Sequence, residues 1–185
     1  MDKRLLSVLG IPADDYEGRF GKVLDPAEDT RFDFYMEATS GRKIFFDLKV
    51  SEAGFGSCAD DEPHRDKLER HYRPHLNEYV DAKWLEPATF FENYEVLRNL
   101  SYLGRHVDSG LVFIFPKANQ HLTDAETAIK RMVSKRLAPR VAIFYLEYLV
   151  ERMLEAVGDD EALRSHFLDF REKHIGILLR GGRGS

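Results

Sequence analysis

Two short segments near the start of the chain alternate between apolar and polar positions. The even-numbered positions of 32–38 and of 44–50 are apolar, and the odd-numbered positions between them are mostly charged or aromatic. Alternation with a period of two is typical of a β-strand with one face in a core. The residues that separate the two segments, Thr39, Ser40 and Gly41, favour a turn. The pattern therefore predicts a β-hairpin.

The alternation also restricts how the two strands pair. If both apolar sets face one core, opposed residues must have numbers that sum to an even value, because a slip of one residue would turn one strand inside out. This favours a connecting loop of three or five residues. In either register Asp33 and Asp47 lie on the same face, directly or diagonally opposed, and Lys49 lies two residues beyond Asp47 on that face.

Two carboxylates and a lysine on one face suit metal-assisted chemistry. Mg²⁺ prefers oxygen ligands and retains several waters, so two carboxylates and a backbone carbonyl make a partial coordination shell. A neighbouring lysine can orient or deprotonate the attacking water and offset charge on a phosphate. Tyr35 and Phe45 share this face, so we expect it to be covered. The alternative is that Asp47 and Lys49 are ordinary solvated cross-strand partners.

At these residues the chain resembles the PD-(D/E)xK nuclease superfamily, which has the restriction-endonuclease-like fold. Asp33 matches the first aspartate of the motif, and Asp47-Leu48-Lys49 matches (D/E)xK, with thirteen residues between them. Phe32 stands where the motif has its proline, which is often missing in the superfamily. The resemblance implies that Asp33, Asp47 and the Leu48 carbonyl bind Mg²⁺, with Mn²⁺ able to substitute. It also implies that Lys49 assists the attacking water.

Two glutamates outside the motif are further candidates for the site. In several branches of the superfamily a glutamate from the helix before the hairpin joins the metal, and Glu17 is the candidate by this resemblance. Glu52 follows Lys49 closely enough in the sequence to support the site.

A helix predicted over residues 87–106 resembles the superfamily helix that packs near the metal and supplies polar residues to it. Glu95, Arg98 and Asn99 have the spacing of neighbours on one helix face. Arg98 is the candidate phosphate contact, with Glu95 or Asn99 as its support. The alternative is a surface ion pair of Arg98 with Glu95.

The rest of the chain predicts helices and strands around the hairpin. Apolar residues recur at helical spacing, and apolar runs mark strands. The predicted helical segments are 5–24, 63–80, 87–106, 148–157 and 161–174, and the predicted strands are 110–115 and 140–146. We expect an α/β fold with a restriction-endonuclease-like core, in which a mixed sheet with an N-terminal hairpin or meander is flanked by helices, with extra helices at the C-terminus. Residues 1–179 are expected to form one domain, and 180–185 a disordered tail.

Charge is distributed unevenly along the chain. The net charge of −5 is not that of a general nucleic-acid binder, but a hydrolase needs only a local basic surface. One segment without acids carries Lys130, Arg131, Lys135, Arg136 and Arg140, and a second basic segment spans 64–75. Either segment could follow a phosphate backbone, and the alternative is an ordinary solvated helix face.

Cysteine content and hydropathy indicate the compartment. The one cysteine, Cys58, excludes an intramolecular disulfide and favours a reducing environment. The most apolar run, 141–150, is interrupted by Glu147 and is too short to span a bilayer. We expect a cytoplasmic protein with no membrane role.

Together these features favour a Mg²⁺-dependent nuclease, an enzyme that hydrolyses phosphodiester bonds of nucleic acid. DNA is the expected substrate, although the sequence does not distinguish DNA from RNA. The alternative is a catalytically inactive module on the same fold that binds nucleic acid or protein. The complete set of two acids and a lysine favours the enzyme. The oligomeric state stays open, with a homodimer as one option.

Overall fold

The computed structural model describes residues 3–12, 14–21, 23–25 and 30–175. Its centre is a mixed five-stranded sheet. The strands are, in spatial order, β1 (Tyr16–Phe20), β4 (Phe34–Ala38), β5 (Lys43–Leu48), β6 (Ser109–Phe115) and β7 (Val141–Tyr145). β1, β4 and β5 form an antiparallel meander, whereas β5, β6 and β7 are parallel. β2 (Val23–Asp25) and β3 (Thr30–Arg31) form a separate two-stranded sheet.

The hairpin of β4 and β5 has the predicted register. Tyr35 pairs with Phe45, so opposed residues have numbers with an even sum. The Ala38 amide donates to the Arg42 carbonyl at 2.8 Å and closes a three-residue loop. Gly41 in this loop has φ of 87°, a left-handed conformation that only glycine adopts without strain. The prediction of the hairpin and of its loop length is confirmed.

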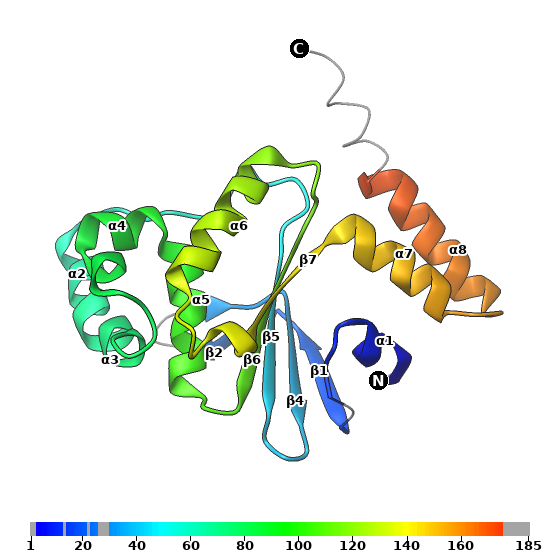
Figure 1. Cartoon of the computed structure of the whole chain (residues 1–185), viewed down its shortest axis with the longest axis horizontal. Helices are drawn as coiled ribbons and strands as arrows, with labels where there is room; N and C mark the ends of the chain where they lie inside the picture. The colour runs from blue at the N-terminus through cyan, green and yellow to red at the C-terminus, as the bar shows by residue number, and fades with distance from the viewer. Residues whose placement is uncertain (1–2, 13, 22, 26–29, 176–185) are drawn as a thin grey trace, which may run out of the picture.

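One face of the sheet carries the larger helical layer, drawn on the left in Figure 1. Tyr35, Phe45 and Phe113 point into this layer and are buried. The odd-numbered face of the hairpin is therefore covered, as expected from its two aromatic residues. The layer consists of α2 (Glu62–Lys67), η1 (Leu68–Tyr72), α3 (Arg73–Leu76), η2 (Ala82–Leu85), α4 (Pro87–Glu92), α5 (Tyr94–Arg105), α6 (Gln120–Met132) and η3 (Ala138–Arg140).

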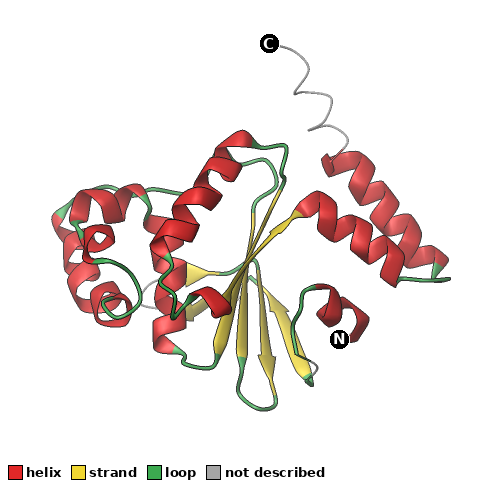
Figure 2. Ribbon diagram, in the orientation of Figure 1, coloured by secondary structure: helices red, strands yellow, loops and turns green. Residues whose placement is uncertain are grey.

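The opposite face of the sheet packs against a second helical layer. Met36, Ile44 and Val112 are buried here. Figure 2 shows the sheet between the two layers. Because both faces are covered, β6 is apolar along most of its length, which explains the uninterrupted apolar run in its sequence. This layer consists of α1 (Lys3–Val8), α7 (Leu146–Ala156), α8 (Glu161–Phe170) and η4 (Arg171–Ile175).

The structure corrects the prediction for residues 5–24. Only α1 is helical, and the segment from Tyr16 onward forms strands β1 and β2. Tyr16 and Phe20 have helical spacing, but β1 pairs along its whole length with β4. The backbone of β1 therefore forms its hydrogen bonds with a distant strand, whereas the spacing of its apolar residues alone predicted hydrogen bonds within a helix.

Two further features of the prediction can be placed. The helix predicted over 63–80 is interrupted, because the π-helical turn η1 follows α2 and Pro74 lies at the start of α3. The expected disordered tail, 180–185, lies outside the described residues. Within the described ranges, no helix combines the length and apolarity that crossing a bilayer requires.

Candidate active site

Asp33 stands immediately before β4, where the hairpin register places it opposite Asp47. Its Oδ2 accepts a hydrogen bond from the Leu48 amide at 2.7 Å. Because the N–H and C=O of one strand residue point to the same side, the Leu48 carbonyl also faces Asp33. An exposed carboxylate and a backbone carbonyl thus meet at the end of β5.

Asp47 is buried on the face of the sheet that α5 covers, with 4% of its surface exposed. Its Oδ2 accepts a hydrogen bond from Asn99 Nδ2 at 2.6 Å. Burial raises the pKa of this carboxyl to about 6, the charge of Lys49 opposes the rise, and the charges of Glu95 and Asp33 add to it. The electrostatic effect of Asp33 on Asp47 is consistent with the two acids lying near each other.

Lys49 links the hairpin to α5. Its Nζ lies 2.8 Å from Glu95 Oε1 and 3.2 Å from Asp47 Oδ1, and 12% of the side chain is exposed. Burial lowers the pKa of Lys49, but the two carboxylates outweigh burial and the pKa is raised. The Lys49 amide donates to the Ile114 carbonyl at 2.9 Å. This bond continues the pairing of β5 with β6 and fixes the base of the lysine side chain.

The polar face of α5 lies over the same end of the sheet. Besides contacting Lys49, Glu95 accepts a hydrogen bond from the Gly56 amide through Oε2 at 2.7 Å. Arg98 Nη2 lies 3.6 Å from Glu95 Oε1, and its guanidinium lies 5.6 Å from the Tyr94 ring centroid. The ion pair that was the alternative interpretation of Arg98 is therefore present. Glu95 thus contacts Lys49, Asn99 contacts Asp47, and Arg98 lies beside Glu95 and Asn99.

The sequence analysis did not identify Gly56 as a residue that contacts the candidate site. The glycines near residue 55 indicate a turn, but nothing in the sequence connects Gly56 with Glu95, which is 39 positions away. The Glu95 amide in turn donates to the Gly56 carbonyl at 3.0 Å. These two bonds fasten the loop after β5 to the start of α5 and hold the Glu95 carboxylate toward Lys49.

Glu17 does not belong to this cluster, which corrects the prediction for that residue. It lies on strand β1 rather than on a helix, and its Oε1 accepts hydrogen bonds from Arg19. In the register Glu17 is opposite Glu37, which in turn is opposite Lys43. Lys43 is four residues from Asp47, about 13 Å along a strand. The described helix that precedes the hairpin, α1, contains no glutamate that could take this role.

Glu52 organises the loop that follows Lys49. Its Oε2 accepts hydrogen bonds from the Val50 and Ser51 amides at 2.7 and 2.9 Å. Partial burial raises the pKa of Glu52, but these backbone bonds and the charge of Lys49 outweigh it and lower the pKa. Glu52 is thus near the site in the chain, while the hydrogen bonds of its carboxylate go to its own loop.

The basic segment 130–140 lies at the other end of the sheet. Arg140 donates to the carbonyls of Leu103 and His106 at 2.7 and 2.6 Å, and to the Ser109 carbonyl at 2.9 Å. Ser109 begins β6 and pairs with Lys43, at the far end of the strand from Asp47. Arg140 therefore joins the ends of α5, β6 and η3, and its segment is separated from the acids.

The other cations of this segment are exposed at the same end. Lys130 pairs with Glu126, and Arg136 Nη1 lies 2.8 Å from Glu78 Oε2. Arg131 and Lys135 are exposed. In the second basic segment, Arg65, Arg70 and Arg73 form ion pairs with Asp60, Asp66 and Glu69. The second segment packs against α5, where the Tyr72 hydroxyl lies 2.8 Å from the Tyr94 hydroxyl.

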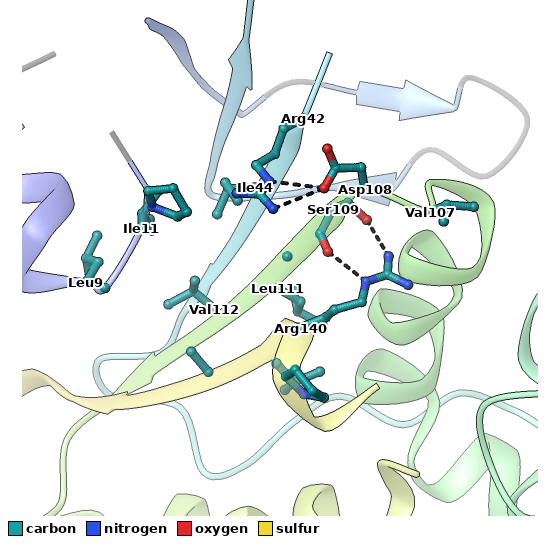
Figure 3. A pocket seen from close by; sticks show the side chains of 16 residues that line it. Leu9, Ile11, Arg42, Ile44, Val107, Asp108, Ser109, Leu111, Val112 and Arg140 are labelled. Atoms are coloured by element: carbon teal, nitrogen blue, oxygen red, sulfur yellow. Dashed lines mark hydrogen bonds and ion pairs between the residues drawn. The ribbon is translucent and has the colours of Figure 1, made fainter. Parts of the chain in front are cut away.

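A cavity of about 290 Å³ opens at this distant end, where β5, β6 and β7 begin (Figure 3). Ile11, Ile44 and Val112 supply apolar walls. The Arg42 guanidinium and Asp108 form an ion pair at 3.1 Å beside it. The two motif acids and the motif lysine do not line this cavity.

The donor set at the end of β5 fits a hard divalent cation. The described residues contain no group of three or more His, Cys, Asp and Glu side chains able to hold a metal. Two carboxylates and a carbonyl are nevertheless enough for Mg²⁺, which retains several waters. Asp47 Oδ1 is buried and, although Lys49 is close, it accepts no hydrogen bond from a described residue. Buried acceptors normally have partners, and a cation would provide one.

Comparison with known proteins gives one match. The family model described as restriction endonuclease associating with ARP matches residues 10–175. This range contains both motif acids, the motif lysine and all of α5. No curated protein and no solved structure matches significantly. The mixed sheet flanked by helices is compatible with a restriction-endonuclease-like core, so the fold and the family resemblance expected from the sequence are confirmed.

Proposed function

Because this chain belongs to the family of restriction endonucleases associating with ARP, we propose that it is a Mg²⁺-dependent nuclease that hydrolyses phosphodiester bonds, with DNA as its substrate. One observation carries the proposal. Lys49 contacts both Asp47 and Glu95 at the end of β5, where the Asp33 carboxylate binds the Leu48 amide. This proximity of acids and lysine at the end of β5 supports the proposal.

The acids and the lysine have separate roles in this proposal. Asp33, Asp47 and the Leu48 carbonyl would hold the cation, which when bound supplies an activated water and neutralises charge on the phosphate. Lys49 orients the attacking water and stabilises the negative charge that develops on the phosphate oxygens. Glu95 limits the positions that the lysine side chain can adopt.

Asn99 and Arg98 complete the site from α5. The amide of Asn99 fixes the orientation of the Asp47 carboxylate through its 2.6 Å hydrogen bond. Arg98 is 20% exposed and lies beside Glu95, so its guanidinium can turn to a phosphate without rearrangement of the helix. The family description also names ARP, and we accordingly propose that this chain associates with ARP in addition to nucleic acid.

Cleavage assays with metal and with site variants test the proposal. Wild-type protein should cleave DNA with Mg²⁺ or Mn²⁺ and fail in EDTA. Asp47→Asn and Lys49→Ala should each reduce the rate by at least about a hundredfold, because the first weakens the binding of the cation and the second removes the charge that stabilises the phosphate oxygens. Circular dichroism and thermal melting would show whether each variant keeps its fold.

Lys173→Ala is the matched control. Lys173 is an exposed lysine in η4, in the helical layer on the other face of the sheet, and its loss should leave the rate unchanged. Equal cleavage by wild type, Asp47→Asn and Lys49→Ala would identify a contaminating nuclease and contradict the assignment. Tight, metal-independent nucleic-acid binding without turnover by the wild type would instead favour the inactive binding module.

A further inference from the structure

Phe20 is an exposed aromatic side chain at the end of β1. Among the large apolar side chains of the described residues it has the greatest exposure, 84%. Burying a phenylalanine side chain stabilises a folded protein by roughly 1.5–3 kcal/mol. The exposed ring of Phe20 does not contribute this stabilisation.

The strand register places Phe20 at the same end of the sheet as the candidate active site. Phe20 pairs with Phe34, the residue that follows Asp33. The next residue, Gly21, donates its amide to the Asp33 carbonyl at 3.2 Å. Two strand spacings, about 10 Å, separate the backbone of β1 from that of β5. The Phe20 ring packs with Phe34 on one face of the sheet and the Asp47 carboxylate lies on the other, so the ring and the carboxylate are farther apart than the strands. At a rise of about 3.4 Å per nucleotide in a stacked strand, a separation of more than about 10 Å corresponds to roughly three or more bases.

The Phe20 ring packs against a row of aromatic residues, whose rings are tilted relative to one another. Its centroid lies 4.8 Å from that of Phe34, which lies 5.4 Å from that of Phe46. Phe46 is buried, whereas Phe34 is half-buried. The three rings cross β1, β4 and β5 on the face opposite the acids. They form a row that is anchored at Phe46 and ends at the exposed ring.

We propose that Phe20 stacks on a nucleobase of the bound nucleic acid, within a few nucleotides of the phosphate that the site attacks. This inference rests on the proposed function, since it places the phosphate at Asp33 and Asp47. A nucleic-acid strand that crosses this end of the sheet would bring one phosphate to the acids and the neighbouring bases to β1. Stacking on an aromatic ring requires a base that is unpaired or at a strand end, so the protein should prefer substrates with unpaired bases.

Equilibrium binding in EDTA tests this inference without turnover. The probes are a fluorescent single-stranded oligonucleotide, a strand of the same length whose nucleotides are abasic, and a blunt duplex. Wild type should bind the base-bearing strand more tightly than the abasic strand. Phe20→Ala should weaken binding of the base-bearing strand about tenfold, the loss expected for one base–aromatic stack, and leave the abasic strand unaffected. Phe20→Trp should restore the preference.

Tyr148→Ala is the matched control, because Tyr148 is another exposed aromatic residue, 55% accessible, on α7. It should bind all three probes as wild type does. Equal affinities of wild type and Phe20→Ala for the base-bearing strand would overturn the inference. So would a change of oligomeric state in Phe20→Ala, because Phe20 would then contact protein. A wild type that binds with the base preference but cleaves nothing would overturn the nuclease assignment alone.

Discussion

At the scale of single residues, the site depends on how one buried carboxylate is satisfied. Asp47 has one oxygen bonded to Asn99 and the other near Lys49. A buried carboxylate that loses a partner bears the cost of desolvation without compensation. Asn99 is itself 1% exposed, so its amide cannot be replaced by bulk water.

Asn99→Ala should therefore lower the free energy of unfolding by about 1–3 kcal/mol. Urea denaturation followed by circular dichroism measures the change. Asn77→Ala is the control, because Asn77 is exposed at the end of α3, and it should change stability by less than about 0.5 kcal/mol. Equal free energies of unfolding of the two variants would mean that the hydrogen bond to Asp47 has no net stabilising role.

The sequence identified most of these residues because their signals are local. Asp33, Asp47 and Lys49 follow from strand alternation, and Glu95 and Asn99 from helical spacing. Glu17 was misplaced because its helix was inferred from a spacing that a strand can also contain.

At the scale of elements, α3 and α5 approach each other unusually closely. A Cβ atom on Gly104 of α5 would lie 1.9 Å from the His75 carbonyl oxygen of α3. The obstacle is backbone, so a rotamer change cannot relieve it. Position 104 requires glycine because any side chain there would collide with the backbone of α3.

Gly104→Ala should separate the two helices and destabilise the protein by at least about 1–3 kcal/mol. Thermal melting would detect the change. Gly54→Ala is the control, because a Cβ atom there meets nothing within 4 Å. A melting temperature of Gly104→Ala equal to that of Gly54→Ala would mean that the close approach is not maintained in solution.

Elements formed by neighbouring residues were the ones that the sequence predicted well. The hairpin is specified by its own alternation and loop, and α5 by its apolar stripe. β1 was missed because only its Tyr16 is buried, so the strand carries almost no alternation of its own. Its conformation depends on β4, and single-sequence periodicity does not contain that information.

At the scale of the whole molecule, two histidines make stability depend on pH. Burial lowers the pKa of His106, and the charges of Lys43 and Arg105 lower it further. Burial, Arg105 and His71 likewise lower the pKa of His75. The ordinary value is 6.5, so below about pH 6.5 the unfolded chain binds more protons than the folded chain. Stability from these groups is present above that pH and is lost as the pH falls.

The contribution of the two histidines to the free energy of unfolding should therefore decrease between pH 7.5 and pH 5.5. The double variant His75→Gln and His106→Gln should lose less stability over this interval. Comparing variants cancels the opposite effect of Asp47, whose raised pKa of about 6 favours the folded state as the pH falls. His166→Gln, at an exposed position, should follow wild type. Parallel pH profiles of wild type and the double variant would refute this account.

The topology of the sheet also determines the order in which the site can assemble during folding. The β4–β5 hairpin closes over a three-residue loop, and such hairpins form within about 1–10 μs. The start of β5 meets the start of β6 through Arg42 and Asp108, which are 66 positions apart, and contacts of that separation form slowly. Asp33 and Asp47 can thus be adjacent early, whereas Lys49 meets Glu95 only after α5 has docked. The complete candidate site therefore exists only once folding is complete, so a nascent or misfolded chain carries the two acids without the lysine and the α5 residues in place.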